Sequence, residues 1–397
     1  MDDRLAIFSG IPAFPQPLHV GKPNVGDRQR FLSRVEAILD SRWFTNNGPV
    51  VQEFERATAE ITGVRHCVAV CNGTMGLEIL IRALDLSGEV IVPSFTFAAT
   101  PGALAWLGLT PVFCDVDLST HNIFPGGIEQ HITSRTTGIL GVHLWGRPCA
   151  IDELAAIADR NSLRLLFDAA HAFGCTHGGC PIGGFGEAEV FSFHATKYAS
   201  AFEGGVIATN NDELAARLRR IRNFGLQEVD LVVEVGINGK MSEVAAAMGL
   251  TSLEHLAELV AVNRENYEHY FEALNAIPGI RVVAFDDRET CNYQYVVAEI
   301  SELDAGLDRD GLMRVLHAEN ILARRYFYPG CHQMEPYRSS PGRGSVSLPA
   351  TEALARRTIS FPTGTSVGAA DIRRIAEIVA RAVDQAEMVR ERLAGML

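Results

Sequence analysis

Between residues 66 and 210, short apolar runs alternate with amphipathic segments, and this alternation predicts an α/β domain. Each apolar run is bounded by Gly, Pro, Asn or Asp, and helical patterns such as GLEILIRAL and IDELAAIADR lie between several of them. Near-continuous apolar strands that alternate with helices are typical of a mostly parallel sheet with both faces covered. The expected strands are HCVAVC (66–71), EVIVPS (89–94), PVFCDV (111–116), TGILGVHLWG (137–146), RLLFDAA (164–170), EVFSFH (189–194) and GGVIATN (204–210).

The pattern changes at about residue 242. A long helical segment (242–279) follows, which indicates a helix that connects two domains. A strand (NYQYVVAEI), a helix (RDGLMRVLHAEN) and a terminal helix after Ala370 then predict a smaller α+β domain. The N-terminal residues are rich in Pro and Gly, which favours an extended arm. The expected organisation is an N-terminal arm (1–25), a large α/β domain (26–250) and a small C-terminal α+β domain (251–397).

Charge and composition narrow the class of protein. The chain carries a net charge of −13 without any block of Lys or Arg, so no nucleic-acid partner is expected. No apolar run approaches the roughly 18 residues of a membrane helix, and the N-terminus lacks a basic region followed by an apolar stretch. The eight cysteines show no CxxC pair, and neither they nor the histidines have metal-ligand spacing. We therefore expect a cytoplasmic protein with reduced thiols, no membrane contact and no metal ion.

Candidate ligand-binding residues follow the predicted strands. In open α/β sheets, ligands bind at the carboxyl ends of the strands. After the first strand, Asn72-Gly73-Thr74 opens a helix, where backbone N–H groups and a Thr hydroxyl could bind a phosphate. The same sequence also fits an ordinary turn and helix cap. Phe97, after the second strand, could stack on a flat ligand or belong to the core.

A carboxylate and an amine follow two later strands. Asp168 ends the strand RLLFD and precedes His171. A carboxylate at the end of an apolar strand is costly to bury without a cationic or protonated partner, although an Asp can also cap a loop. Lys197 follows EVFSFHAT, with Ser192 five residues earlier and small residues around it. Such a lysine is either an ordinary solvated side chain or a nucleophile.

Together these residues fit pyridoxal phosphate. This cofactor needs phosphate donors, an aromatic plate, a carboxylate that pairs with a protonated ring nitrogen, and a lysine that reacts with its aldehyde. Lys197 would supply that amine and, once released, would move the proton between the substrate and cofactor carbons. Burial and nearby positive charge must lower the pKa of such a lysine before it can attack. A dinucleotide site is not indicated, because GGCPIGGFGEAE (178–189) is not GxGxxG and opens no helix.

The order of these motifs resembles that of the DegT/DnrJ-type nucleotide-sugar aminotransferases, a branch of the fold-type I pyridoxal-phosphate enzymes. The similarity runs from FTNNGP through NGT, VPSFTFAAT, PVFCDVD, DAAH and SFHATK to GINGKMSE and RYFYPGCH. It implies a large domain with a mixed, mostly parallel sheet covered by helices, and a smaller C-terminal α+β domain. Two segments depart from the family pattern. FYPGCH has Gly330 and Cys331 where PLH is expected, and AFEGG has Phe202 in place of a small residue.

The resemblance also implies roles for individual residues. Lys197 would form the Schiff base with pyridoxal phosphate, Asp168 would pair with the ring nitrogen, and His171 would lie near the ring oxygen. Phe97 would stack on the ring. The residues expected at the cofactor phosphate are Gly73, Thr74, Ser192 and, from the neighbouring subunit of an obligate homodimer with shared sites, Asn238. The residues expected to face the sugar nucleotide are Lys240, Tyr328 and His332.

The activity implied by the resemblance is transamination of a keto-deoxy sugar nucleotide, with dTDP-4-keto-6-deoxyhexose as the expected substrate and glutamate as the amino donor. The spelling SFHATK is more similar to the branch that aminates C4 than to the C3-specific branch. A sugar 3-aminotransferase is therefore one alternative. A sugar dehydratase is another, although such relatives replace the lysine that Lys197 retains. A third alternative is a non-catalytic regulatory protein on the same fold, which loss of Lys197 or Asp168 would have favoured.

Overall fold

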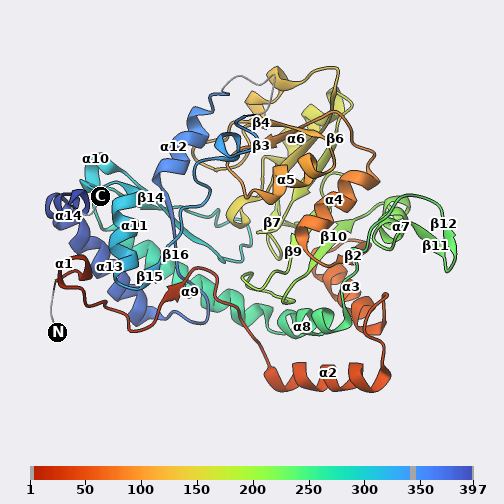
Figure 1. The fold of residues 1–397 in the computed structure, drawn as a ribbon, viewed down its shortest axis with the longest axis horizontal. Helices are drawn as coiled ribbons and strands as arrows, with labels where there is room; N and C mark the ends of the chain where they lie inside the picture. The colour runs from red at the N-terminus through yellow and green to blue at the C-terminus, as the bar shows by residue number, and fades with distance from the viewer. Residues whose placement is uncertain (1–3, 340–345, 396–397) are drawn as a thin grey trace.

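The computed structural model describes residues 4–339 and 346–395, and it consists of a large layered domain and a smaller domain (Figure 1). A seven-stranded sheet in the order β2-β10-β9-β6-β5-β3-β4 forms the centre of the large domain. Neighbouring strands are parallel except at β10, which runs antiparallel to β2 and β9. This confirms the predicted α/β fold. The strands are β2 (His66–Val70), β3 (Glu89–Pro93), β4 (Thr110–Cys114), β5 (Thr136–Val142), β6 (Arg164–Asp168), β9 (Glu189–Ser192) and β10 (Gly205–Thr209).

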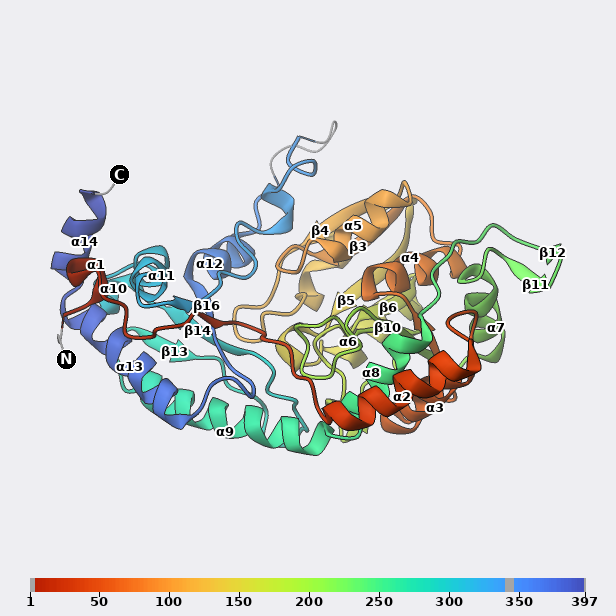
Figure 2. The same ribbon diagram turned by 60° about the horizontal axis from the view of Figure 1, so that its bottom comes forward.

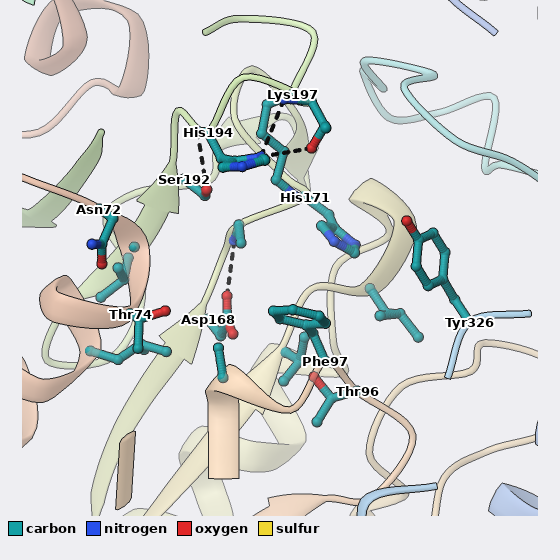
Figure 3. A pocket seen from close by; sticks show the side chains of 18 of the residues that line it. Asn72, Thr74, Thr96, Phe97, Asp168, His171, Ser192, His194, Lys197 and Tyr326 are labelled. Carbon is teal, nitrogen blue, oxygen red and sulfur yellow. Dashed lines mark hydrogen bonds between the residues drawn. The ribbon is translucent and has the colours of Figure 1, made fainter. Parts of the chain in front are cut away.

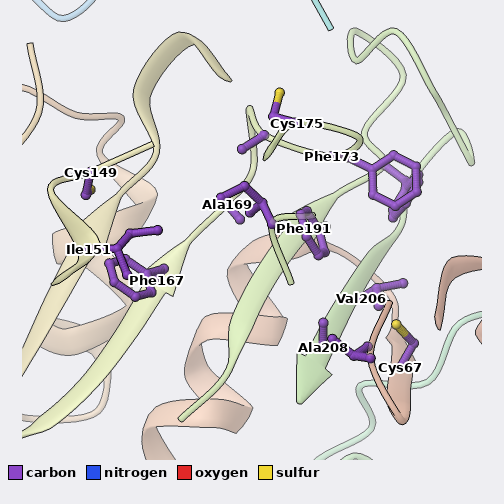
Figure 4. Packing of buried hydrophobic residues seen from close by; sticks show 14 of the residues in the cluster. Cys67, Cys149, Ile151, Phe167, Ala169, Phe173, Cys175, Phe191, Val206 and Ala208 are labelled. Atoms are coloured by element: carbon purple, nitrogen blue, oxygen red, sulfur yellow. The ribbon is translucent and has the colours of Figure 1, made fainter. Parts of the chain in front are cut away.

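Both faces of this sheet are buried, which explains the near-continuous apolar runs in the sequence. Successive side chains of a strand point to opposite faces. Leu166 belongs to the cluster that packs on α4, α5 and α7, whereas Phe167 and Phe191 belong to the cluster under α3, α6 and α8 (Figure 4). Helix α2 packs outside this layer, against α8. These helices are α2 (Arg28–Ser41), α3 (Pro49–Thr62), α4 (Gly73–Ala83), α5 (Ala99–Trp106), α6 (Ile151–Arg160), α7 (Asp212–Ile221) and α8 (Glu243–Leu253).

The small domain is built on a three-stranded antiparallel sheet, in the order β13-β14-β16. Its strands are β13 (Ile280–Val282), β14 (Val296–Ile300) and β16 (Thr358–Phe361). The helices around it are α9 (Leu256–Asn275), α10 (Glu302–Ala305), α11 (Arg309–Ala318), α12 (Pro349–Arg357), α13 (Ala369–Asp384) and α14 (Ala386–Ala394). The expected smaller α+β domain is therefore present.

Short elements connect these layers. Two small hairpins pair β7 (Thr176–His177) with β8 (Cys180–Pro181) and β11 (Leu226–Glu228) with β12 (Leu231–Val232). The single-turn helices are η1 (Pro125–Gly127), η2 (Glu129–His131), η3 (Leu144–Gly146) and η4 (Cys331–Gln333).

The N-terminal segment, expected as an extended arm, lies along the small domain. It contains the short helix α1 (Ala6–Ser9) and the strand β1 (Leu18–His19), which pairs in parallel with β15 (Ile321–Leu322). The backbone N–H groups of Ala6 and Ala13 donate to the Glu319 carboxylate at 2.6 and 2.7 Å. Residues far apart in the sequence therefore complete one domain.

The single helix expected over 242–279 is wrong, because the chain forms two helices, α8 and α9, that are bent by 62°. The break falls at Glu254, whose carboxylate accepts from Arg30 Nε at 2.7 Å and from Arg34 Nη2 at 2.6 Å, both in α2. No Gly or Pro marks this position, so the sequence carries no breaking signal there. In the part of the chain that the structure describes, no single helix is long and apolar enough to cross a membrane, and the bent pair α8–α9 meets that test only by length and composition.

A buried ion pair ties α3 to β2 and to the end of α7. Glu55 Oε1 accepts from Arg222 Nη1 at 2.6 Å and from the backbone N–H of Ala69 at 2.9 Å. The same Arg222 nitrogen donates to the Ala69 carbonyl at 2.7 Å. Both side chains are 10% exposed or less, so each charge depends on the other for compensation.

We expect Glu55→Ala to lower the free energy of unfolding by about 3 kcal/mol, because it leaves Arg222 as a buried charge without its carboxylate. Urea unfolding followed by circular dichroism measures this change. The matched control is Glu53→Ala, since Glu53 lies exposed in the same helix. Equal losses of stability in the two variants would contradict the structural role of the pair.

Candidate active site

A cavity of about 480 Å³ opens at the carboxyl ends of the central strands, and side chains from both domains line it (Figure 3). Most of the site residues expected from the sequence are brought together here. The expected residues that line the cavity are Gly73, Thr74, Phe97, Asp168, His171, Ser192 and Lys197.

Asp168 is a buried carboxylate with few partners. It ends β6, where Thr100 Oγ1 donates to its Oδ2 at 2.8 Å and the backbone N–H of Ala170 donates to its Oδ1 at 3.1 Å. Burial raises the pKa of the Asp168 carboxyl, and the Thr100 and Ala170 hydrogen bonds and the Lys197 charge oppose that rise. Within the described residues no ion pair involves this carboxylate, so it can accept a hydrogen bond from a protonated ligand in the cavity.

Lys197 lies in the loop after β9 and has the properties of a nucleophile. Its Nζ donates to Tyr295 Oη at 3.0 Å and lies 5.4 Å from the centroid of that ring. Burial lowers the pKa of Lys197 to about 8, although the Asp168 and Tyr326 charges act in the opposite direction. A larger fraction of this amine is therefore neutral at neutral pH than for a solvated lysine. The alternative of an ordinary solvated lysine does not fit this half-buried position in the cavity, with a hydrogen bond to Tyr295.

His171 and Tyr295 form a hydrogen-bonded support for that amine. The backbone N–H of Trp145 donates to His171 Nδ1 at 3.3 Å, and His171 Nε2 lies 3.2 Å from Tyr295 Oη. Burial, together with the Lys197 charge, lowers the pKa of His171 well below its usual range, so the ring is neutral. Since Nδ1 accepts, Nε2 carries the hydrogen and donates to Tyr295. Tyr295 Oη therefore accepts a hydrogen bond from His171 Nε2 and another from Lys197 Nζ.

The N-terminus of α4 forms one wall of the cavity. Asn72 caps it through a bond from the backbone N–H of Met75 to Oδ1 at 2.8 Å. Gly205 in β10 permits close approach to this turn, because a Cβ at that position would lie 2.7 Å from the Asn72 carbonyl carbon. The first N–H groups of a helix, next to the Thr74 and Ser192 hydroxyls, are suited to an anionic group such as a phosphate.

Phe97 is not a core residue, which was the alternative to a stacking role. Its side chain is 59% exposed and lines the cavity. An exposed aromatic ring beside a polar cavity offers a flat surface to a ligand ring.

Four expected residues lie outside the cavity of this single chain. His332 is buried, and its Nδ1 lies 2.7 Å from Ser94 Oγ while its Nε2 lies 3.6 Å from Glu352 Oε1. The Lys240 ammonium lies 4.4 Å from the Phe224 ring centroid. The other two are Tyr328 and Asn238. The Arg325 guanidinium packs over the Tyr328 ring, and Asn238 is exposed.

Several lining residues were missed from the sequence. Thr96 and His194 follow β3 and β9, beside residues that were predicted, and Glu203 precedes β10. The other three come from the small domain, where Tyr295 precedes β14 and Arg324 and Tyr326 follow β15. The only signal for Tyr295 was a polar aromatic in front of the apolar strand VVAEI. The missed residues that line the cavity include Thr96, His194, Glu203, Tyr295, Arg324 and Tyr326.

The described residues contain no group of three or more His, Cys, Asp or Glu side chains that could hold a metal ion. The eight cysteines are free, and most are buried.

The fold is that of an aminotransferase. The chain belongs to the DegT/DnrJ/EryC1/StrS aminotransferase family, which it matches over residues 26–380. The resemblance given by the motifs is thereby confirmed.

Individual relatives agree with this assignment. The chain is 39% identical over 322 residues to the dTDP-4-amino-4,6-dideoxy-D-glucose transaminase of Shigella dysenteriae. The aligned region covers 81% of this chain and 88% of that protein. It is 34% identical over 363 residues to the Escherichia coli protein of the same name, which covers 91% of this chain and 97% of that protein. The crystal structure of DesI in the presence of its TDP-sugar product superposes with a TM-score of 0.94 and 50% identity, over 98% of this chain and 99% of that one.

We expect the Lys197 amine of the cofactor-free protein to react with an amine-specific reagent with a pH midpoint of about 8. In Asp168→Asn the midpoint should move to lower pH, because the carboxylate that raises the pKa of Lys197 is lost. Mass spectrometry of the peptide that contains Lys197 measures the modified fraction at each pH. Asp152→Asn, at an exposed position in α6, is the control and should leave the midpoint unchanged. An upward shift in Asp168→Asn would contradict this account.

Proposed function

We propose that this protein is a pyridoxal-phosphate-dependent transaminase that converts dTDP-4-keto-6-deoxyglucose to dTDP-4-amino-4,6-dideoxy-D-glucose, with glutamate as the amino donor. The observation that carries the proposal is the pairing of a lysine of lowered pKa with a buried carboxylate in one cavity of this aminotransferase fold. The names of the two curated relatives and the sugar product of DesI support the choice of substrate.

The residues around the cavity fit pyridoxal phosphate. When bound, this group supplies an aldehyde carbon that reacts with amines and a ring that withdraws electrons from the substrate carbon. Asp168 forms no ion pair in the part of the chain that the structure describes, and it would accept a hydrogen bond from the protonated ring nitrogen. Phe97 would stack on the ring, and the N-terminus of α4 would hold the phosphate with Thr74 and Ser192. His171 would lie beside the ring oxygen.

Lys197 would both tether the cofactor and transfer the proton. Its amine reaches the cavity in a form that is neutral in part at neutral pH, so that Nζ can attack a carbonyl carbon or take a proton from carbon. Tyr295 and His171 would hold the amine in place when it is not bound covalently, because their hydrogen-bonded chain ends at Nζ. Burial raises the pKa of the Tyr295 phenol, so its hydroxyl stays protonated during this step.

The presence of Lys197 also argues against two alternative functions, a sugar dehydratase and a regulatory protein. A sugar dehydratase on this scaffold is disfavoured because Lys197 is present and lines the cavity. A regulatory protein without catalysis is disfavoured for the same reason, and also because Asp168 is buried and lines the same cavity as that lysine. Amination at C3 is distinguished from amination at C4 by the product formed.

The first test is the absorption spectrum of the purified protein with pyridoxal phosphate, before and after addition of glutamate. We expect a visible band that bleaches with glutamate, and a band that is lost or unresponsive in Lys197→Ala. Incubation with dTDP-4-keto-6-deoxyglucose should then restore the band and yield a 4-amino sugar, identified by nuclear magnetic resonance. Because Lys197→Ala removes the amine that transfers the proton, turnover by this variant should be slower by roughly 10²- to 10⁴-fold.

Each outcome of that experiment has a definite meaning. A wild-type protein that takes up no cofactor would contradict the proposed activity. A protein that binds cofactor without any response to glutamate would contradict the choice of donor. A 3-amino product from a 3-keto substrate would replace the C4 assignment.

We also propose that the protein acts as a homodimer whose active sites are shared, as the family resemblance implies. The segment that carries β11 and β12 supports this arrangement. It projects from one end of the molecule (Figure 1, Figure 2). Several of its apolar side chains are exposed. Val229, Val232 and Val235 are 88%, 61% and 71% exposed. Asn238 follows directly, and a second copy would bring it to the cofactor phosphate of its neighbour.

We expect the double variant Val229→Glu/Val232→Glu to be monomeric, because two charges in this apolar row oppose burial against a second copy. Sedimentation velocity measures the mass of the particle. Leu303→Glu is the control, since Leu303 is 92% exposed in α10 at the opposite end of the molecule (Figure 1). A double variant that sediments as a dimer would contradict this interface.

A further inference from the structure

Arg324 provides a second cationic side chain in the cavity, besides Lys197. Its backbone is firmly held, because its N–H donates to the Ser360 carbonyl at 3.0 Å and its carbonyl accepts from the Ser360 N–H at 2.8 Å. The residue follows β15 and pairs with the edge of β16. Arg324 therefore lines the cavity from a fixed point of the small domain.

The guanidinium of Arg324 has no carboxylate partner among the described ion pairs. Its Cζ lies 5.7 Å from the centroid of the Tyr326 ring, and both residues line the cavity. The next residue behaves differently. Arg325 Nη1 lies 3.1 Å from Asp310 Oδ1, its Cζ lies 4.4 Å from the Tyr328 ring centroid, and it does not line the cavity. The Arg325 guanidinium is thus paired with the Asp310 carboxylate, whereas the described ion pairs include none for Arg324.

An arginine without a protein partner, in a cavity of a chain with net charge −13, is suited to an anionic ligand. A guanidinium presents parallel N–H donors that match the two oxygens of a carboxylate or the oxygens of a diphosphate. Both expected substrates are anions of this kind. Glutamate carries carboxylates, and the nucleotide sugar carries a diphosphate.

The position of Arg324 relative to Lys197 favours the carboxylate. Tyr326 lies beside Arg324, its ring centroid is 6.4 Å from that of Tyr295, and Tyr295 holds Lys197 Nζ at 3.0 Å. An anchor in the same cavity as the reacting amine, on the side of Tyr326 and Tyr295, suits glutamate, in which a carboxylate is bonded directly to the carbon that bears the amine. In a 4-keto sugar nucleotide, the diphosphate is bonded to C1, across the sugar ring from the reacting carbon.

We propose that Arg324 binds a carboxylate of the amino donor. This inference rests on the proposed function and assigns the donor side of the same site to one residue of the small domain. Because the donor and the sugar nucleotide occupy the cavity in turn, the residue would be needed for the first half of the reaction and dispensable for the second.

The test measures the two half-reactions separately in the cofactor-loaded protein, by stopped-flow absorption. Arg324→Gln should raise the glutamate concentration needed for half-maximal bleaching by roughly 10- to 100-fold, because a bond between charged groups is lost. Arg324→Lys should recover part of this loss, since it keeps the charge without the fork. Arg325→Gln is the matched control and should behave as the wild type. The concentration of keto sugar nucleotide needed for the second half-reaction should stay unchanged in Arg324→Gln.

A binding measurement gives a readout that does not depend on turnover. Glutarate has the carboxylates of the donor and no amine, and calorimetry with the loaded protein should show weaker glutarate binding in Arg324→Gln but not in Arg325→Gln. Unchanged glutamate and glutarate binding in Arg324→Gln, with a responsive wild type, would overturn this inference alone. Weaker binding of the sugar nucleotide instead would assign Arg324 to the diphosphate and overturn the donor assignment. A wild type that does not respond to glutamate would overturn the proposed function and this inference with it.

Discussion

Burial of charge is the constraint on which the centre of this structure depends. Asp168 ends an apolar strand and Lys197 lies in a loop of small residues, and burial moves the pKa of each group toward the neutral form. Two hydrogen bonds support the carboxylate, and the Tyr295 hydroxyl supports the amine. A fold gains little stability from such a pair. It gains groups whose protons can be exchanged near neutral pH, which is a property of reactive sites.

The cavity also depends on how the two domains meet. The large domain contributes the N-terminus of α4, the Asp168 carboxylate and Lys197 to the cavity. Tyr295, Arg324 and Tyr326 come from the small domain. The small-domain groups contact one another and reach Lys197 through Tyr295. Side chains from both domains are therefore needed to form the cavity, and a change in how the domains pack would alter it.

The sequence was informative where local pattern and position in the sheet coincide. The strands were predicted because both sheet faces are buried, and Asp168, Lys197 and Phe97 were found because ligands bind at carboxyl ends of strands. Tyr295 and Arg324 escaped because they belong to another domain and precede or follow short strands. The break at Glu254 was missed because arginines from a distant helix mark it. The contacts of His332 with Ser94 and Glu352 likewise join separate segments, which no local pattern reveals.

The docked N-terminal segment has a consequence for how the chain is made. Glu319 holds the backbone of Ala6 and Ala13, β1 completes its pairing only with β15, and Arg392 Nε donates to the Ile7 carbonyl at 3.1 Å. This segment thus finds its partners only after more than 300 further residues have been synthesised, since Ala6 and Ala13 lie 313 and 306 residues before Glu319. The large domain can fold during translation, whereas the small domain cannot be completed before Glu319 and β15 have been synthesised, and the early segment stays without these partners in the interval.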